Sequence, residues 1–446
     1  MSKLSIKSLL TTAVAFSLLL TVPAFADSQA RVVRLSEVQG DVQIDRNTGQ
    51  GSEKAFLNLP ITQGAKLQTR KDGRAEVEFE DGSTLRVTPD TVIDFAQLSL
   101  RDSGAKVSAV RLQEGTAYVN FAGAKDAEFT LTFGHEKLSL THSAHLRIEM
   151  ADTVATVAVF NGDVQVEGDS GNVAVSKNHT ASFDLTNGDR STLAKNLEPD
   201  PFDAWDKQQD QYHQQYANNS YSSYSPYAYG TSDLNYYGSF SNVAGYGMLW
   251  QPYFAGAGWD PFMNGAWAFS PGLGYGWVSG YPWGWTPYHY GSWVYLPTNG
   301  WAWQPGGSWA GWTQPRIIHP PSHFLLPQPP SNSGHGTIAV NRGLMPIQFG
   351  RSSNRLEISN NSAGLGIPRG GIKNMNQLSR TAQQEGFATA KVHTAPVGIN
   401  SWHSGYSAPA SQAGAWHGGS APSVSAGHSS PSPSPSPSPS HSSAHR

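Results

Sequence analysis

The residues most suggestive of catalysis lie in the string Gly168-Asp-Ser-Gly171, with histidines such as His135 upstream. A serine nucleophile needs a histidine base and an acidic partner, and these residue types are all present. The string is also flanked by the valine-containing runs 164–166 and 173–175, between which a hairpin turn favours Gly, Asp and Ser. We therefore interpret it as a turn and expect no catalytic residues.

The spacing of possible ligands predicts neither a metal site nor a cofactor site. His142 and His145 are three residues apart, which places their side chains on opposite faces of a strand. The chain has no cysteine, which excludes disulfides, thiolate metal sites and thiol catalysis. Glycoside hydrolysis needs two carboxylates, and residues 236–312 contain only Asp260. We expect a non-enzymatic protein without a metal or cofactor.

Tryptophan is the side chain that distinguishes this sequence, because 11 of the 14 Trp lie within residues 250–312. Large rings can form the core of units too small for layers of leucine, since each buries about 150–250 Å². Exposed rings could instead form a platform that stacks on sugars of wall glycans. Both interpretations stay open, with inner rings as core and with Tyr288, His289 and Tyr290 outside. The candidate ligand-binding residues are Trp259, Asp260, Trp285, Tyr288 and His289.

Three frames of 13 residues repeat in the tryptophan-rich segment, at offsets of 27 and then 26 residues. The frames are 238–250, 265–277 and 291–303. In the third frame, Trp293 and Trp303 lie on either side of a Pro-Thr-Asn-Gly turn. Each frame therefore predicts an aromatic β-hairpin.

Short runs of alternating apolar and polar residues, without a long helical period, predict an all-β antiparallel domain over residues 27–198. A turn at Asp81-Gly82-Ser83 would set Phe79 opposite Leu85. A two-residue Asn-Gly turn would set Val164 opposite Val159. These two hairpins are the clearest local expectations for this domain.

Six motifs follow one another within residues 32–185: Val38-x-Gly40-x-Val42, Gly64-Ala-Lys-Leu67-x-Thr69, Gly73-Arg-Ala-x-Val77, Asp81-Gly82-Ser83-x-Leu85, Leu112-Gln-Glu-Gly115 and Val159-Phe-Asn-Gly-Asp-Val164. In this order they resemble a FecR-like domain. Regulatory members of that family add a cytoplasmic part that contacts a sigma factor and one membrane span. This chain departs from them, because only eight residues precede its apolar run. The resemblance implies a domain that recognises an envelope partner.

Residues 282–293, Pro-Trp-Gly-Trp-Thr-Pro-Tyr-His-Tyr-Gly-Ser-Trp, are similar to a Trp/Gly/Pro-rich repeat family of unknown function. That family often follows a FecR-like domain in exported bacterial proteins. The resemblance implies the order of the two domains and adds no activity.

Residues 1–26 have the features of a secretory signal: Lys3 and Lys7, an apolar run over 9–22, and Ala24-Phe25-Ala26 before Asp27. No later stretch reaches the ~18 apolar residues that a membrane span needs. We therefore expect a cleaved, exported protein of the periplasm or the cell surface, without a transmembrane span after cleavage.

Composition divides the rest of the chain. Residues 27–198 form the acidic β domain, 199–235 a polar linker without apolar periodicity, 236–312 the tryptophan-rich module, and 313–446 a basic tail rich in Pro, Ser and His. We expect the linker to be extended or loosely ordered and the tail to be mostly disordered.

The sequence thus predicts a non-enzymatic bacterial envelope protein that binds or scaffolds, with glycan or cell-wall contact through Trp residues. The alternative is a sensor or regulatory module that recognises a protein partner through the FecR-like domain. The expected partner is an envelope protein or a wall polysaccharide. Nucleic acid is excluded because the aromatic module lacks the Lys and Arg that phosphates require.

Overall fold

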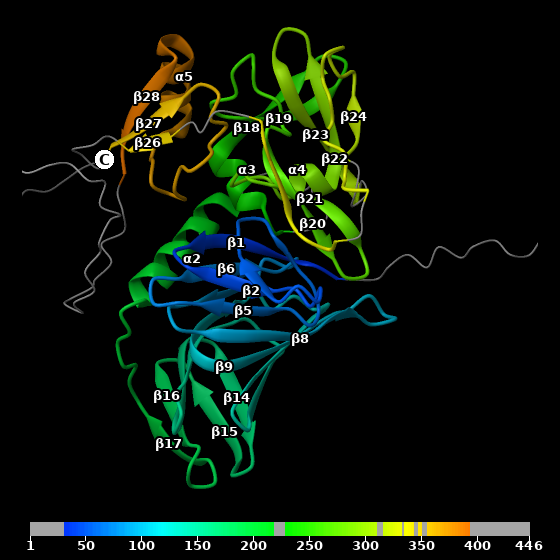
Figure 1. The fold of residues 1–446 in the computed structure, drawn as a ribbon. Helices are drawn as coiled ribbons and strands as arrows, with labels where there is room; N and C mark the ends of the chain where they lie inside the picture. Colours follow the sequence, from blue (N-terminus) through cyan, green and yellow to red (C-terminus); the bar gives the residue numbers. More distant parts are fainter. Residues whose placement is uncertain are drawn as a thin grey trace, which may run out of the picture. The chain divides into compact units, whose positions relative to one another are not determined.

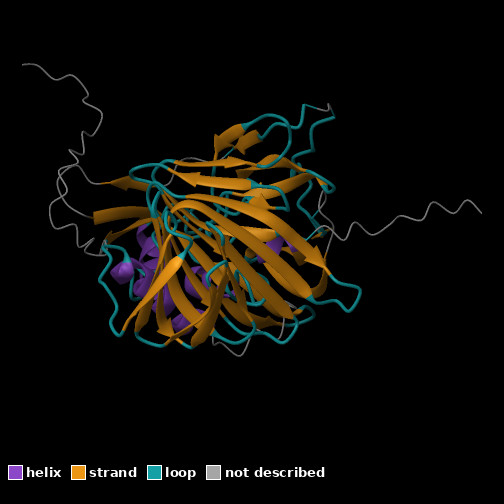
Figure 2. Ribbon diagram, turned by 90° about the horizontal axis from the view of Figure 1, so that it is seen from below, coloured by secondary structure: helices purple, strands orange, loops and turns teal. Residues whose placement is uncertain are grey.

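Strands dominate the structure, a computed structural model, and they form several sheets with a few helices against them (Figures 1 and 2). The structure describes residues 31–217, 228–309, 315–331, 334–342, 347–349 and 355–392. The predicted all-β class is confirmed, with a β domain followed by aromatic hairpins. The predicted signal peptide and the last residues of the tail lie outside the described residues.

The first sheet of the β domain is antiparallel throughout. Its strands lie in the order β4 (Pro60–Ile61), β1 (Val33–Gln39), β6 (Arg74–Glu78), β7 (Thr84–Val87), the second half of β9 (Lys106–Phe121), β12 (Ala144–Met150), β13 (Val154–Asn161), β16 (His179–Asp184) and β17 (Arg190–Ala194). Strand β17 therefore forms one edge of this sheet.

The second sheet contains one parallel pair, β9 with β10. Its strands lie in the order β3 (Ser52–Lys54), β2 (Val42–Asp45), β5 (Lys66–Thr69), β8 (Val92–Leu100), the first half of β9, β10 (Ala127–Phe133), β11 (Glu136–Leu140), β14 (Asp163–Gly168) and β15 (Gly171–Ser176). Val, Ile, Leu and Phe side chains of both sheets share one buried core, so the sheets form two layers.

Strand β9 belongs to both layers, and Gly115 lies where it changes sheet. The backbone of Gly115 has φ +88°, a left-handed conformation that glycine adopts without steric cost. A side chain there would also approach the backbone oxygen of Asp90 to 2.6 Å. The crossing of β9 between the layers therefore depends on this glycine.

The two hairpins expected within the β domain need correction. Strands β6 and β7 do form a hairpin, but Val77 rather than Phe79 lies opposite Leu85. Phe79 instead pairs with Ser83 through the backbone, so the loop begins one residue earlier than predicted. The faces are unchanged, because the register is shifted by two residues and side chains alternate with a period of two.

The expected pairing of Val159 with Val164 is wrong. Strand β13 pairs with β12 and β16 in the first sheet, whereas β14 pairs with β11 and β15 in the second. The Asn-Gly turn carries the chain from one layer to the other. Alternating valines would suit either arrangement, because both strands bury one face in the shared core.

The three aromatic hairpins are confirmed. They are β18 (Gly238–Val243) with β19 (Gly247–Pro252), β20 (Asn264–Ser270) with β21 (Gly274–Ser279), and β22 (Tyr290–Leu296) with β23 (Gly300–Trp309). In each, the aromatic residues of the repeat lie directly opposite one another: Phe240 with Trp250, Trp267 with Trp277, and Trp293 with Trp303. These Trp side chains are buried, as expected for inner rings.

The predicted linker is not loosely ordered where the structure describes it. Residues Asp203–Ala217 form helix α2, and Thr231–Tyr237 form helix α3. Helix α2 buries Trp205, Asp206, Gln209, Asp210 and Tyr212 although its apolar periodicity is weak. The charged residues of its buried face explain why the sequence resembled a linker.

The described part of the tail also contains regular structure. It comprises β24 (Ile317–Ile318), β25 (Ile338–Asn341), β26 (Ile347–Phe349), β27 (Arg355–Ser359), α5 (Met375–Glu385) and β28 (Phe387–Lys391). Strands β24 and β25 extend the aromatic hairpins, while β26, β27 and β28 form a sheet of their own. These segments are the ordered parts of a tail predicted to be mostly disordered, and residues 393–446 lie outside the described residues.

Replacing Gly115 with alanine should lower the free energy of unfolding by ~2–4 kcal/mol, because the new methyl group adds a backbone clash to an unfavourable φ. Urea denaturation of the purified chain measures the loss. Gly104→Ala is the matched control, since Gly104 also has positive φ but has open space around it. Equal losses in both variants would contradict a role for close packing at Gly115.

Candidate functional site

Four of the five residues predicted to bind a ligand lie in the protein interior. Trp259, Trp285, Tyr288 and His289 are buried, and the Asp260 side chain is 21% exposed. The expectation that Tyr288, His289 and Tyr290 face outward is wrong, since all three are buried. The short helix α4 (Thr286–His289) lies between β21 and β22 and directs the side chains of this connector inward.

The contacts of Trp259 and Tyr288 are those of a packed core. The indole Nε1 of Trp259 donates a hydrogen bond to the Tyr281 hydroxyl at 2.9 Å. The ring of Tyr288 stacks on Trp283, with centroids 6.1 Å apart, and its hydroxyl donates to the Pro261 carbonyl. Ligand binding by these residues stays a prediction, but in this conformation their faces are occupied by neighbouring rings.

Trp285 and His289 lie in a separate small cluster with Tyr229 and Val32. Trp285 contacts the ring of Tyr229 edge-on, at a centroid distance of 5.4 Å. Burial, together with the charge of Arg34, lowers the pKa of His289 to about 3. The imidazole is therefore neutral at physiological pH, and this cluster joins the aromatic module to the start of the β domain.

The aromatic core extends beyond the predicted module on both sides. Its members include Tyr212 of α2 and Leu234 of α3, and Leu356, Ile358 and Ile372 from the predicted tail. The Trp283 indole donates a hydrogen bond to the Ala363 carbonyl at 2.6 Å, and the Tyr237 hydroxyl donates to Ile367 at 2.6 Å. The hairpins therefore do not form their core alone.

A buried network of charged side chains, which the sequence did not predict, lies between helix α2 and strands β6 and β7. At its centre the Glu76 carboxylate is fully buried. It accepts hydrogen bonds from Arg369 at 2.6 Å, from Arg86 at 2.8 Å and from Ser36 at 2.7 Å. His213 of α2 also approaches it, at 3.0 Å.

A second anionic centre of the network is Asp233 of helix α3. Its carboxylate pairs with Arg34 at 2.6 Å and with Arg369 at 2.9 Å, and it accepts a hydrogen bond from Tyr212 at 2.8 Å. Arg34 pairs in addition with Glu78 at 3.0 Å. Because Arg369 contacts both Glu76 and Asp233, the network is continuous.

Helix α2 contributes the acidic partners of Arg86. Asp206 lies 2.6 Å and Asp210 2.7 Å from its guanidinium. The same two aspartates face His145 of β12, with 2.7 Å between Asp206 and the imidazole Nε2. One arginine and one histidine therefore share two carboxylates beneath the helix.

Protonation in the network follows these contacts. Burial alone would raise the pKa of Glu76, but the charges of His213, Arg369 and Arg86 hold it well below its usual range. Burial likewise opposes ionisation of Asp233, whose pKa is lowered by Arg369 and Arg34. Burial would lower the pKa of His213, but the Glu76 carboxylate raises it. Glu76 and Asp233 are therefore ionised at neutral pH, whereas burial raises the pKa of Glu78 although Arg34 opposes this effect.

One sequence signal could have revealed this network. Asp203, Asp206, Asp210 and His213 are spaced three, four and three residues apart, which places them on one helix face. Arg369 carried no such signal, since it lies 293 residues from Glu76. The segment resembles a linker because the residues on the buried face of the helix are mostly polar, so its apolar periodicity is weak.

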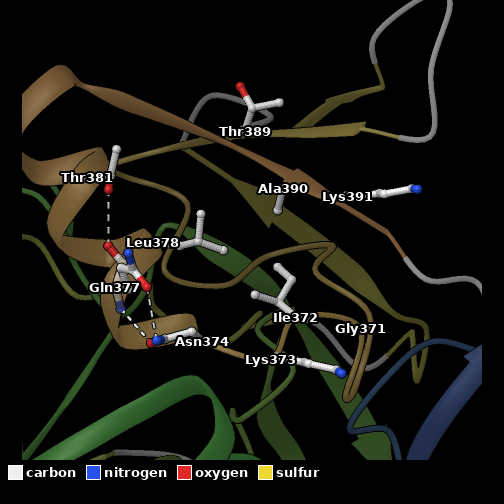
Figure 3. Close-up of a pocket in the computed structure, with 10 residues that line it drawn as sticks. All are labelled: Gly371, Ile372, Lys373, Asn374, Gln377, Leu378, Thr381, Thr389, Ala390 and Lys391. Atoms are coloured by element: carbon white, nitrogen blue, oxygen red, sulfur yellow. Dashed lines mark hydrogen bonds between the residues drawn. The ribbon is translucent and has the colours of Figure 1, made fainter.

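A shallow pocket lies at the C-terminal end of the described chain, beside α5 and β28 (Figure 3). Its volume is about 400 Å³. The lining residues are Gly371, Ile372, Lys373, Asn374, Gln377, Leu378, Thr381, Thr389, Ala390 and Lys391. It contains none of the sequence-predicted site residues.

Two segments of the described chain match known protein families. Residues 65–165, from β5 to β14, match the FecR protein family. The chain carries a FecR-like domain. Residues 231–318 match a family of unknown function, DUF6600, which covers α3 and the aromatic hairpins. The two predicted resemblances are confirmed, in the predicted order.

Other comparisons are weaker. Two crystal structures of a proposed anti-sigma factor from Parabacteroides distasonis align at 18% and 17% identity, with TM-scores of 0.27. Each alignment covers 31% of this chain and 63% of the other, so this chain spans less than two thirds of that protein. No curated protein shows significant sequence similarity. None of the described helices is long and apolar enough to cross a membrane.

Replacing Arg369 with glutamine should destabilise the folded chain by ~3–5 kcal/mol, because Glu76 and Asp233 would stay buried with one cation fewer. Urea denaturation followed by far-UV circular dichroism measures the change. Arg342→Gln is the control: Arg342 is 38% exposed and 3.6 Å from Asp260, so its loss should cost less than ~1 kcal/mol. Similar losses of unfolding free energy in Arg369→Gln and Arg342→Gln would show that the buried ion pairs stabilise the chain no more than an exposed pair does.

The folded chain should lose stability as pH rises from neutrality. The pKa of His213 is raised above its ordinary value of 6.5, so its stabilisation is complete below 6.5 and disappears as pH rises through the folded-state pKa. His145 acts in the same direction. In urea titrations across this range, His213→Gln should flatten the decline, whereas His142→Gln, at an exposed position, should not. An unchanged slope in His213→Gln would refute this coupling.

Proposed function

We propose that this chain is a non-enzymatic bacterial envelope protein whose FecR-like domain binds a protein partner. The match of residues 65–165 to the FecR protein family supports a role of this class. The interior position of the candidate glycan-stacking rings favours a protein partner over a wall polysaccharide. The signal-like residues 1–26 support export, to the periplasm or the cell surface.

The observation that carries this proposal is the open apolar row at edge strand β17. Ile148, Val157, Ala181 and Leu193 lie side by side across β12, β13, β16 and β17. The first three are fully buried, whereas Leu193 is 51% exposed. Among the described strands, β17 pairs only with β16. The core face therefore continues to an edge where its last side chain is uncovered.

An extended segment of a partner could pair with β17 and cover Leu193. Adding a strand to a sheet edge uses backbone hydrogen bonds for affinity and side-chain contacts for specificity. Edges of this kind are otherwise protected by charge, proline or covering loops, because they promote unwanted pairing. The FecR-like domain is held from the other side by α2, α3 and Arg369 through the buried ionic network.

The test begins with a photoreactive amino acid at position 193 of the full chain, expressed in its native host. The expected result is one discrete crosslinked protein that, once purified, binds the purified chain saturably. Leu193→Asp should weaken this binding at least tenfold. Leu100→Asp is the matched control, because Leu100 of β8 is also exposed on the same domain. Equal binding by wild type and Leu193→Asp would refute docking at β17.

The glycan alternative is tested on the same protein. Soluble peptidoglycan fragments should leave the tryptophan fluorescence unchanged, since the candidate rings are buried. A saturable change that is lost in Trp285→Ala, with an unaltered far-UV spectrum, would overturn the proposal in favour of glycan binding through the aromatic module.

A further inference from the structure

Three connections of the FecR-like domain bring together a histidine and two carboxylates. His135 lies in the turn between β10 and β11, Asp169 in the turn between β14 and β15, and Asp189 in the loop before β17. Their ligand atoms all lie within 4.8 Å of one another. No local spacing in the sequence groups these residues, because His135 and Asp189 are 54 positions apart.

Glu136, the first residue of β11, adds a carboxylate whose oxygens have no protein partner. Its side chain is 1% exposed, yet neither oxygen accepts a hydrogen bond from the described residues. Asp189 is equally buried; its Oδ2 lies 3.2 Å from Nδ1 of His135, whereas its Oδ1 lacks a partner among the described residues. Buried carboxylates are normally paired, so these oxygens are available to bind a cation.

The local backbone keeps space for the Glu136 carboxylate. Gly168, at the end of β14, lies directly beneath it, and a Cβ atom at this position would collide with both of its oxygens. Gly168 immediately precedes Asp169, so the same turn both admits Glu136 and supplies a further carboxylate. The Ser170 hydroxyl donates to the backbone oxygen of Asp189 at 2.8 Å and fixes the neighbouring loop.

The charges of the cluster are not balanced by the groups that face Glu136. Burial, and then the charges of Asp189 and Asp169, raise the pKa of Glu136 to about 7, while His135 opposes this effect. The nearby lysine Lys137 is engaged with Glu167 at the surface, at 3.3 Å. Three carboxylates therefore repel one another around a single imidazole.

The geometry points to a binding site for a divalent first-row transition-metal ion, with His135, Asp169 and Asp189 as ligands and the buried carboxylate of Glu136 beside them. A mixed set of imidazole and carboxylate groups suits Zn²⁺, whereas Ca²⁺ prefers oxygen ligands alone. Such an ion neutralises the buried carboxylates and ties together three loops that are distant in sequence. This inference does not depend on the proposed protein partner.

Isothermal titration of the full chain with ZnCl₂, after treatment with a chelator, tests the site. Every variant keeps the histidines outside the FecR-like domain, so any zinc bound by them contributes equally to each titration. The comparison therefore uses the difference in stoichiometry between wild type and variants. Wild type should bind one equivalent more than the double variant Glu136→Gln/Asp189→Asn. The control Glu167→Gln, an exposed carboxylate on β14, should retain that equivalent. Equal stoichiometry in wild type and double variant would refute the site.

Thermal unfolding separates metal binding from a purely structural role of the same residues. Without metal, Asp189→Asn should melt at the same temperature as wild type or higher, because it removes one of the repelling carboxylates. Added ZnCl₂ should raise the melting temperature of wild type and of Glu167→Gln, but not that of Asp189→Asn. An equal rise in Asp189→Asn would overturn the proposal, and a rise with CaCl₂ but not ZnCl₂ would overturn the assigned class of metal.

Discussion

Burial of the Glu76 carboxylate beneath helix α2 is the constraint on which the remaining architecture depends. A buried charge is tolerated only where other groups compensate it, and the partners of Glu76 come from β7, from α2 and from the segment before α5. Segments that are far apart in sequence must therefore reach their places together. This requirement explains why a polar linker and part of a tail are ordered in the folded chain.

The aromatic hairpins also depend on partners from other segments, through hydrogen bonds and ring contacts instead of ion pairs. Buried indole N–H groups usually find acceptors. Those of Trp267, Trp277 and Trp293 have none among the described residues, whereas other rings of the module bond to segments outside the repeats. Trp250 donates to Leu234 of α3, and Trp283 donates to Ala363 beyond β27. The repeats determine each hairpin, whereas hydrogen bonds to neighbouring segments determine how the hairpins are assembled. A module that looks self-contained by composition is completed by its surroundings.

The groups available for interaction lie at the end of the FecR-like domain that carries β17. Asp189 directly precedes this edge strand, so the carboxylate cluster and the exposed Leu193 belong to neighbouring parts of one structure. The central ionic network, by contrast, is occupied by its own internal pairs. The proposed recognition of a protein partner rests on this unpaired edge beside a tightly packed interior.

The sequence alone determined the β class, the FecR-like resemblance and the three aromatic hairpins, because cross-strand partners such as Trp293 and Trp303 are only ten residues apart and a single turn fixes their register. The tertiary structure decided where β13 and β14 pair, that α2 is a buried helix, and that Trp285 is inside. These outcomes depend on contacts between distant segments. Alternation and composition describe which residues suit an interior, but a buried carboxylate such as Glu76 resembles a solvent-exposed one until Arg369 is brought beside it.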